Sequence, residues 1–300
     1  MKFILKPKSP YNFDLHLKAF SFNKPQPDVY ENGVWKRALR LNSGRIIPVK
    51  VTPIGTVEKP KLEVLILKKI KENERRELKD KLSWILNTET DLADLYNFMD
   101  NDPVLTEVKR KLYGLRAFNY STVFEGLIKS IIQQQISLIG SMYITNRLVE
   151  RFGEKVKIGK EIYREFPSLE SLAEASLADL KKCGLSRQKS SYIKEVSERI
   201  VQDKIDLERW KDLASQEIIE RLMKFKGVGR WTAELTVVTS TGKDALPADD
   251  LGARRAVSKF YFGGKKISGE KLREFSNTWG KFRGVVTYYL ICSERLKLLK

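Results

Sequence analysis

The pattern of apolar residues changes once along this chain of 300 residues, near residue 72. Before that point, short β-rich runs occur at 34–41, 46–51 and 62–67, and residues 1–70 contain seven of the ten prolines. Beyond it, helical periodicity interrupted by Gly, Pro and Ser continues to the C-terminus. The sequence therefore predicts an α+β fold in which a small antiparallel sheet precedes an all-helical region.

The charge of the chain is strongly positive, because 56 Lys and Arg residues outnumber 38 Asp and Glu residues and give a net charge of +18. Such a charge attracts polyanions, so nucleic acid is the first partner to consider. No run approaches the roughly 20 apolar residues of a membrane-spanning helix. The N-terminus also lacks the apolar core of a signal peptide, and we therefore expect a soluble, cytoplasmic protein without a membrane partner.

Histidine and cysteine are too rare to support several common chemistries. The only histidine is His16, and the two cysteines, Cys183 and Cys292, can form neither a disulfide framework nor a four-cysteine metal cluster. Carboxylates, Lys, Tyr and Ser/Thr remain as acids, bases or nucleophiles. The abundance of Lys and Glu beside few Cys, Met and His is typical of proteins from hot environments.

A predicted helix that begins at Thr122 has an apolar face that is interrupted at its end by Gln133-Gln134-Gln135. The glutamines could simply end the helix at the surface. Alternatively, their amides, which both donate and accept hydrogen bonds, could be presented to a base pair or to the gap left by a base. The residues alone leave both interpretations open.

Residues 215–238 predict two helices joined by a turn that contains Gly227-Val228-Gly229. Glycines permit positive φ and close approach of a ligand, and the second helix begins with unpaired N–H groups at its positive dipole end. These features suit a phosphate. A Gly-x-Gly turn also occurs in helix pairs without a ligand, but Lys226 and Arg230 beside the glycines favour phosphate binding.

Two adjacent acids, Asp249 and Asp250, follow the hairpin within residues 246–252. Either acid could cap the predicted helix 251–260 at its N-terminus. Together, residues 225–233 and 246–252 resemble the helix-hairpin-helix (HhH-GPD) DNA glycosylases, and in particular the alkylated-base branch of the 3-methyladenine DNA glycosylase II type found in bacteria and archaea. Residues 124–137 are similar to another segment of that branch, and the resemblance extends over about residues 100–295.

The resemblance implies both a domain organisation and an activity. We expect an N-terminal sheet domain with a flanking helix at 1–100 and a helical glycosylase region at 101–300, with the active-site cleft between two helical subdomains. The implied activity is that of a monofunctional DNA glycosylase of base excision repair. Such an enzyme flips an alkylated purine out of duplex DNA and hydrolyses its N-glycosidic bond, leaving an abasic site. We expect a nucleoid-associated monomer from a thermophilic archaeon, acting on double-stranded DNA that contains damaged bases.

The resemblance also assigns the catalytic role. In the family, the catalytic Asp precedes a basic residue by four positions, which selects Asp250 with Arg254 and leaves Asp249 as the helix cap or a structural neighbour. Bifunctional members carry a lysine nucleophile on the second hairpin helix, whereas the matching position here is Trp231. A tryptophan cannot form a Schiff base, so the resemblance implies hydrolysis without strand cleavage.

The remaining site residues are also assigned by resemblance. Trp231, Phe20 and Trp279 would line the base pocket, since aromatic faces attract a cationic alkylated base by about 1–2 kcal/mol. Gln134 or Gln135 would fill the hole left by the flipped base. Gly227, Gly229, Arg230 and Thr232 would bind DNA phosphates, and the backbone carbonyls of Met223, Phe225 and Val228 would hold a structural Na⁺ or K⁺. We expect no other cofactor, and no iron-sulfur cluster, because that cluster needs four cysteines near the C-terminus.

Two other functions remain open at the level of sequence. One is an oxidised-purine glycosylase of the 8-oxoguanine type, which shares a sheet domain followed by helices. The other is a non-enzymatic helix-hairpin-helix protein that grips DNA through its phosphates. The second would need the glycines and the basic charge, but neither Asp250 nor an aromatic pocket.

Overall fold

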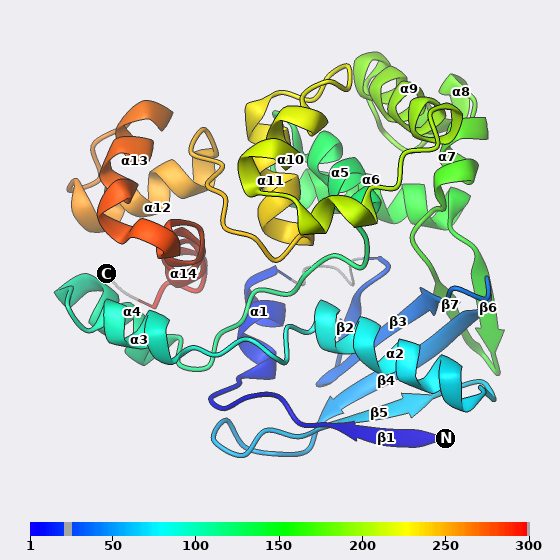
Figure 1. Cartoon of the computed structure of the whole chain (residues 1–300), viewed down its shortest axis with the longest axis horizontal. Helices are drawn as coiled ribbons and strands as arrows, with labels where there is room; N and C mark the ends of the chain where they lie inside the picture. The colour runs from blue at the N-terminus through cyan, green and yellow to red at the C-terminus, as the bar shows by residue number, and fades with distance from the viewer. Residues whose placement is uncertain (21–25, 299–300) are drawn as a thin grey trace.

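Five antiparallel strands form a sheet in the order β1-β5-β4-β3-β2 within the N-terminal part of the chain (Figure 1). The computed structural model describes residues 1–20 and 26–298. The strands are β1 (Lys2–Leu5), β2 (Val29–Glu31), β3 (Val34–Arg40), β4 (Ile46–Pro53) and β5 (Leu62–Ile66). Alternate residues of β5 are buried, as expected for a strand with one face on a core. That core is completed by α1 (Phe13–Phe20) and α2 (Glu72–Ile85).

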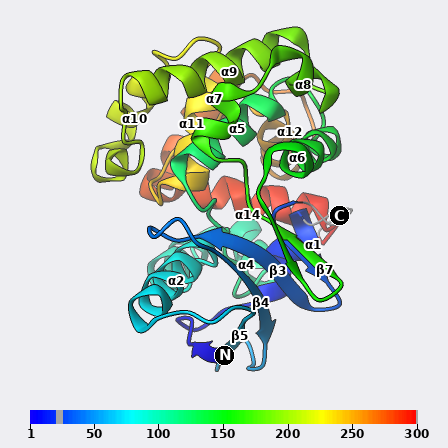
Figure 2. The ribbon, with the colours of Figure 1, turned by 90° about the vertical axis from the view of Figure 1, so that its right-hand side faces the viewer.

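The helices that follow form two lobes, each with its own apolar core. The central lobe contains α5 (Val123–Gln133), α6 (Leu138–Phe152), α7 (Leu169–Glu174), α8 (Leu177–Lys182), α9 (Arg187–Gln202), α10 (Ser215–Leu222) and α11 (Arg230–Ser240). The C-terminal lobe contains α3 (Ala93–Met99), α4 (Pro103–Lys111), α12 (Leu251–Tyr261), α13 (Gly269–Ser276) and α14 (Arg283–Arg295). The sheet and the central lobe lie at opposite ends of the molecule in Figure 2. None of the described helices is long and apolar enough to cross a membrane.

The predicted α+β fold is confirmed, and the helices on either side of residue 100 contribute to one core. Leu95 of α3 and Leu105 of α4 share a core with Val286 and Leu290 of α14. The C-terminal lobe is thus built from two stretches that are distant in the sequence. The sheet part ends with α2, because the apolar faces of α3 and α4 are buried against the last helices rather than against the sheet.

The expectation of an all-helical second region is wrong at residues 155–164. There, β6 (Lys155–Ile158) and β7 (Glu161–Arg164) form an antiparallel hairpin. Val156 and Tyr163 share a small core with Ala38 and Ile46 of the sheet. The hairpin therefore forms because its alternating apolar residues are covered by the neighbouring sheet.

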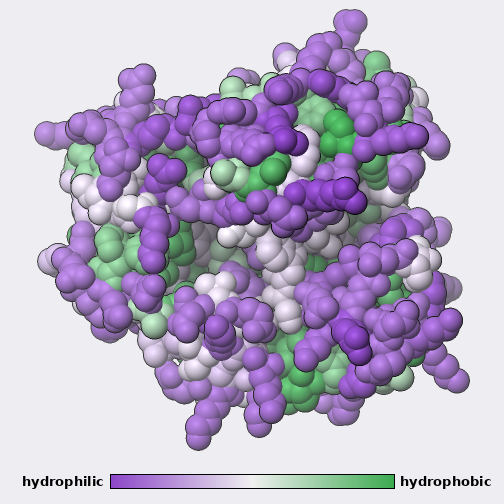
Figure 3. Space-filling view, in the orientation of Figure 1, coloured by the Kyte–Doolittle hydropathy of each residue, from purple (hydrophilic) through white to green (hydrophobic). Residues whose placement is uncertain are grey.

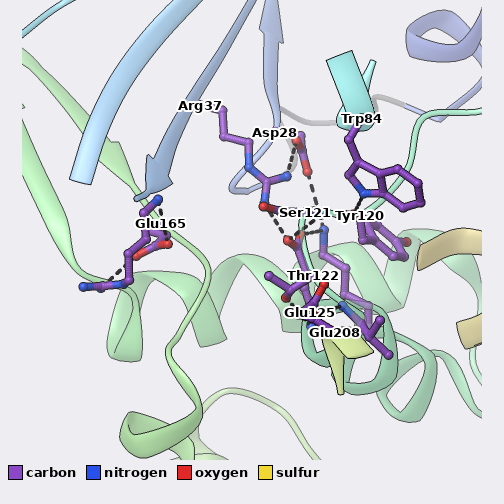
Figure 4. Close-up of polar contacts among 12 residues, drawn as sticks. Asp28, Arg37, Trp84, Tyr120, Ser121, Thr122, Glu125, Glu165 and Glu208 are labelled. Carbon is purple, nitrogen blue, oxygen red and sulfur yellow. Dashed lines mark hydrogen bonds and ion pairs between the residues drawn. The ribbon is translucent and has the colours of Figure 1, made fainter. Parts of the chain in front are cut away.

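A buried cluster of charged residues joins the sheet to the central lobe (Figure 4). Arg37 of β3 pairs with Asp28 at 2.6 Å and with Glu125 of α5 at 2.5 Å, and Lys129 pairs with Glu125 at 2.7 Å. The side chains of Arg37 and Glu125 are 2% and 1% exposed. Burial alone would raise the pKa of Asp28, but the charges of Arg37 and Lys129 together lower it. The four side chains, which we call the interlobe charge cluster, form a network in which only Asp28, at 25% exposure, is partly open to solvent.

A second contact between the sheet and the segment that follows β7 involves a carboxyl group whose pKa is raised. Glu165, just after β7, accepts a hydrogen bond from the backbone N–H of Arg40 at 3.0 Å and pairs with the guanidinium of Arg40 at 2.8 Å. Burial raises the pKa of Glu165 from 4.5 to about 7 and outweighs the lowering effect of Arg40 and Arg37. Between about pH 4.5 and 7, Glu165 is therefore protonated in the folded protein but ionised in the unfolded chain.

Glu165→Gln is expected to flatten the dependence of stability on pH. Because the folded state binds the extra proton, the free energy of unfolding of the unaltered protein falls as pH rises through this window. The variant is neutral throughout, so its loss of stability between pH 5 and pH 8 should be smaller by about 2–3 kcal/mol. Urea denaturation at the two pH values measures the difference. An identical loss in both proteins would contradict the assignment.

Candidate functional site

The hairpin turn between α10 and α11 contains two glycines in different environments. Gly227 has a φ of +80°, and a Cβ at this position would lie 2.2 Å from the ring of Tyr192. Gly229 precedes α11 with a φ of −85°, and an added Cβ would meet no atom within 4 Å. No side chain among the described residues caps the N-terminus of α11. The turn is thus closely packed at Gly227 and open at Gly229. At the open side, the N–H groups in the first turn of α11 can receive an anion.

Gly227→Ala and Gly229→Ala should therefore have different effects. Gly227→Ala should lower the free energy of unfolding by about 1–3 kcal/mol, because it combines a positive φ with a steric clash. Gly229→Ala should change the stability by less than about 1 kcal/mol, yet weaken DNA binding by placing a methyl group at the open face. Thermal denaturation and DNA titration separate the two effects. Equal destabilisation by both substitutions would contradict this description of the turn.

The other predicted phosphate and cation ligands also lie around this turn. Arg230 is half-exposed, and its Nε donates to Glu234 at 2.9 Å. Thr232 is only 2% exposed, and its hydroxyl oxygen accepts a hydrogen bond from Gln134, so any phosphate contact at Thr232 would use its backbone N–H. The turn residues, including Met223, Phe225 and Val228, line a surface hollow of about 710 Å³.

The structure separates the two glutamines that sequence analysis considered together. Gln134 turns inward, and its Nε2 donates to the carbonyl of Gly227 at 2.8 Å and to the hydroxyl of Thr232 at 2.9 Å. Gln135 is exposed and has a φ of +53°. Of the two wedge candidates, Gln135 is therefore the more exposed, while the amide nitrogen of Gln134 is engaged by the hairpin.

Asp250 itself caps α12, which corrects the expectation that Asp249 would do so. Its Oδ1 accepts a hydrogen bond from the N–H of Ala253 at 2.8 Å. Its Oδ2 forms no hydrogen bond to any residue that the structure describes. Asp249 is exposed and faces the start of α13, where a Cβ on Gly269 would lie 2.0 Å from its Oδ1. The cap orients Asp250 and still leaves one carboxylate oxygen available.

An arginine and two aromatic side chains gather where α14 packs against α1, and α14 also packs against α12, the helix that Asp250 caps. Burial lowers the pKa of Arg295, and Cys292, Glu294 and, most weakly, Asp250 partly offset this effect. The guanidinium of Arg295 lies 4.8 Å from the ring centroid of Phe20, and its Nε donates to the carbonyl of Ala19 at 3.0 Å. Phe20 also stacks on Tyr288, with the ring centroids 5.8 Å apart. Arg295 thus contacts Phe20 and feels the charge of Asp250.

The two tryptophans assigned to the base pocket occupy different environments. Trp231, at the start of α11, is partly exposed, and its indole N–H is buried without a hydrogen-bond partner among the described residues. Trp279 is 3% exposed and packs against Phe275 and Tyr261 inside the C-terminal lobe, with centroid distances of 5.3 and 5.8 Å. This position favours a core role for Trp279 over the predicted role in the base pocket.

A buried carboxylate links the hairpin to the C-terminal lobe. Glu234 of α11 pairs with Arg273 of α13 through hydrogen bonds of 2.8 and 3.2 Å, and it also accepts from Arg230. This contact fixes the start of α11 relative to the lobe that contains Asp250. In the space-filling view, a hollow crosses the centre of the surface (Figure 3). The residues that line it are pale, and are thus less hydrophilic than the mostly purple residues around them.

Comparison with known proteins assigns the chain to a family. The HhH-GPD superfamily of base excision DNA repair proteins matches residues 128–281. The chain belongs to this superfamily. The structure of 3-methyladenine DNA-glycosylase from Archaeoglobus fulgidus is 36% identical, with a TM-score of 0.87, and the match covers 98% of this chain and 99% of that one. The predicted resemblance is therefore confirmed.

Other relatives of this HhH-GPD protein differ in their named activities. DNA-3-methyladenine glycosylase of Bacillus subtilis is 27% identical over 203 residues, which are 67% of each chain. A probable N-glycosylase/DNA lyase of Methanothermobacter thermautotrophicus is 25% identical over 93% of this chain and 92% of the relative. An 8-oxoguanine glycosylase/lyase of Clostridium acetobutylicum bound to DNA has a TM-score of 0.75 over 99% of both chains, but its 22% identity establishes a shared fold only.

Nothing in the sequence of this HhH-GPD protein indicated Arg295, and Tyr288 stood only among several C-terminal aromatic residues that could complete the pocket or belong to the core. Both belong to α14, about 40 residues beyond Asp250, and they reach α1 at the other end of the chain. The local sequence of α14 carries no motif that would indicate this contact. Only the packing of α14 on α1 and α12 brings these side chains together.

Proposed function

We propose that this HhH-GPD protein is a monofunctional DNA glycosylase that releases alkylated purines from duplex DNA and leaves an abasic site. The observation that carries the proposal is the position of Asp250. One carboxylate oxygen is held by the N-terminus of α12, and the other has no hydrogen-bond partner among the described residues. Arg295, which lies over the ring of Phe20, is within electrostatic range of this carboxylate. The 3-methyladenine glycosylases among its relatives support this choice of substrate class.

The reaction requires a fixed negative charge beside the sugar. Cleavage of the N-glycosidic bond develops positive charge on the deoxyribose, and a carboxylate stabilises that charge and orients or deprotonates the attacking water. Asp250 performs this role in our proposal. Its hydrogen bond to Ala253 holds the carboxylate in one orientation before DNA binds.

The flipped base would be held by aromatic side chains. Alkylation at a ring nitrogen makes a purine cationic, and an aromatic face attracts such a ring by about 1–2 kcal/mol when water is excluded. Phe20 and Trp231 are partly exposed and available for this contact, whereas Trp279 is buried in its lobe. We therefore retain Phe20 and Trp231 as the pocket residues.

The hairpin would grip the DNA backbone. The N–H groups at the start of α11, together with Arg230, would receive a phosphate. Among the described residues, the carbonyl oxygens of Met223 and Val228 accept no hydrogen bond, while that of Phe225 accepts one from Val228. Uncommitted carbonyls in one turn fit a Na⁺ or K⁺ ion, which would neutralise charge between the turn and the phosphate.

Borohydride trapping tests the monofunctional part of the proposal. Helix α11 contains no lysine, and Trp231 stands where the bifunctional relatives place their nucleophile. Borohydride should trap no more protein on duplexes that contain 7-methylguanine or 8-oxoguanine opposite cytosine than it traps on an undamaged duplex. A strong adduct with the 8-oxoguanine duplex would instead favour a bifunctional oxidised-purine enzyme. Binding to both duplexes without release of either base would favour the non-enzymatic alternative.

A further inference from the structure

The end of α5 is held by a lysine from another helix. Lys189, in the first turn of α9, donates from Nζ to the carbonyl of Ile132 at 2.8 Å and to that of Gln134 at 2.5 Å. The last carbonyls of a helix have no partner within the helix, and a cation there is favourable because of the helix dipole. Lys189 thus satisfies two carbonyls on the segment that leads into Gln135.

The same segment is also held by the hairpin. Gln134 donates from one amide nitrogen to the carbonyl of Gly227 in the turn and to the hydroxyl of Thr232 in α11. Thr232 and Gly227 are themselves fixed, because Thr232 is buried and Gly227 lies against the ring of Tyr192. The end of α5, the start of α9 and the phosphate-binding turn therefore form one connected unit.

Gln135 projects from this unit in a conformation that a free loop would rarely keep. Its φ of +53° lies in the left-handed region, which is uncommon for residues other than glycine. Such a conformation persists when its surroundings determine it. Ile136 and Ile139 beside Gln135 are 38% and 51% exposed, so a planar amide and two apolar side chains share one surface next to the hairpin.

We infer that Gln135 alone enters the DNA stack when the base is flipped, and that Lys189 and Gln134 are positioning residues that couple this wedge to the hairpin. The inference rests on the proposed function. When a phosphate binds at the start of α11, the turn is fixed on the DNA, and the carbonyl of Gly227 fixes Gln134 in turn. The depth at which Gln135 enters the stack is thereby set by the same contact that grips the backbone.

Lys189→Met tests the coupling, because methionine keeps the length of the side chain but donates no hydrogen bond. Single-turnover release of 7-methylguanine is measured from a duplex with cytosine opposite the lesion, and from the same strand with the lesion in an unpaired bubble. Flipping a paired base requires a few kcal/mol, whereas an unpaired base requires much less. We expect Lys189→Met to slow release from the paired duplex by about tenfold and from the bubble by less than about twofold. Lys189→Arg should restore the rate on the paired duplex to within about threefold.

Arg187→Met is the matched control, since it removes one positive charge from the exposed face of the same helical turn. It should change release from both substrates by the same factor. Equal slowing of both substrates by Lys189→Met would overturn the inference, because Lys189 would then act as a phosphate contact or a structural residue.

A second measurement does not depend on base release. A duplex with a tetrahydrofuran abasic site opposite 2-aminopurine reports the entry of a wedge as a change in fluorescence. The unaltered protein should produce this change, whereas Lys189→Met and Gln135→Ala should lose most of it. If the signal behaves in this way while no 7-methylguanine is released, the proposed function fails and the coupling stands. A full signal from either variant would overturn the coupling.

Discussion

Replacing Asp250 by asparagine is expected to lower the single-turnover rate of base release by about 10²- to 10³-fold, which is the usual effect of removing one preorganised electrostatic group. The fold should remain intact, because asparagine caps helices about as well as aspartate and can accept the same hydrogen bond from Ala253. The free energy of unfolding should therefore change by less than about 1 kcal/mol. Quench-flow or manual sampling with excess protein measures the rate, and urea denaturation measures the stability.

Asp249→Asn is the matched control, since it removes the same charge from an exposed side chain that directly precedes Asp250. Asp249 does not cap α12, so its replacement should leave the rate within about threefold of the unaltered value, a change of less than about 1 kcal/mol in the barrier. The reverse pattern, with Asp249→Asn inactive and Asp250→Asn active, would show that the catalytic carboxylate has been wrongly assigned.

Removing Arg37 is expected to destabilise the protein by about 3–5 kcal/mol, the largest effect on stability that we predict. Arg37→Met leaves the buried carboxylate of Glu125 with Lys129 alone and deprives Asp28 of its closest cation. An uncompensated buried charge is strongly unfavourable. Because the interlobe charge cluster joins β3 to α5, its loss should loosen the attachment of the sheet to the central lobe.

Urea denaturation of three further variants provides the controls. Lys2→Met breaks an exposed ion pair with Glu63 and should change stability by less than about 1 kcal/mol. Glu125→Gln should also be destabilising, and Arg37→Met combined with Glu125→Gln should destabilise by less than the sum of the two single effects. Full additivity in the double variant would mean that the two side chains do not interact as described.

The features predicted from the sequence are those whose signals are local. The hairpin at 215–238 combines a periodic helix, a Gly-x-Gly turn and a second helix within one short segment, and the structure has α10 and α11 there. The sheet could be predicted because its strands are short, β-rich and separated by turns. In both cases the pattern and the structure that it forms lie within a few residues of each other.

The features that sequence reasoning missed depend on contacts between distant segments. The packing of α3 and α4 against α14 joins residues that are almost 200 positions apart, and no local pattern indicates it. The inward turn of Gln134 depends on Gly227 and Thr232, more than 90 residues away. The choice of the cap between Asp249 and Asp250 stayed open for another reason, because two adjacent acids carry the same local signal and only the backbone geometry distinguishes them.

Product analysis with one defined duplex tests the central claim most directly. The duplex carries a single 7-methylguanine opposite cytosine, and the free base and the damaged strand are measured from the same reaction. We expect free 7-methylguanine to appear in a one-to-one ratio with an uncut strand that breaks only on later treatment with alkali. We also expect Asp250→Asn to slow the formation of both products by about 10²- to 10³-fold. Strand cleavage without alkali, or full activity of Asp250→Asn, would contradict the claim.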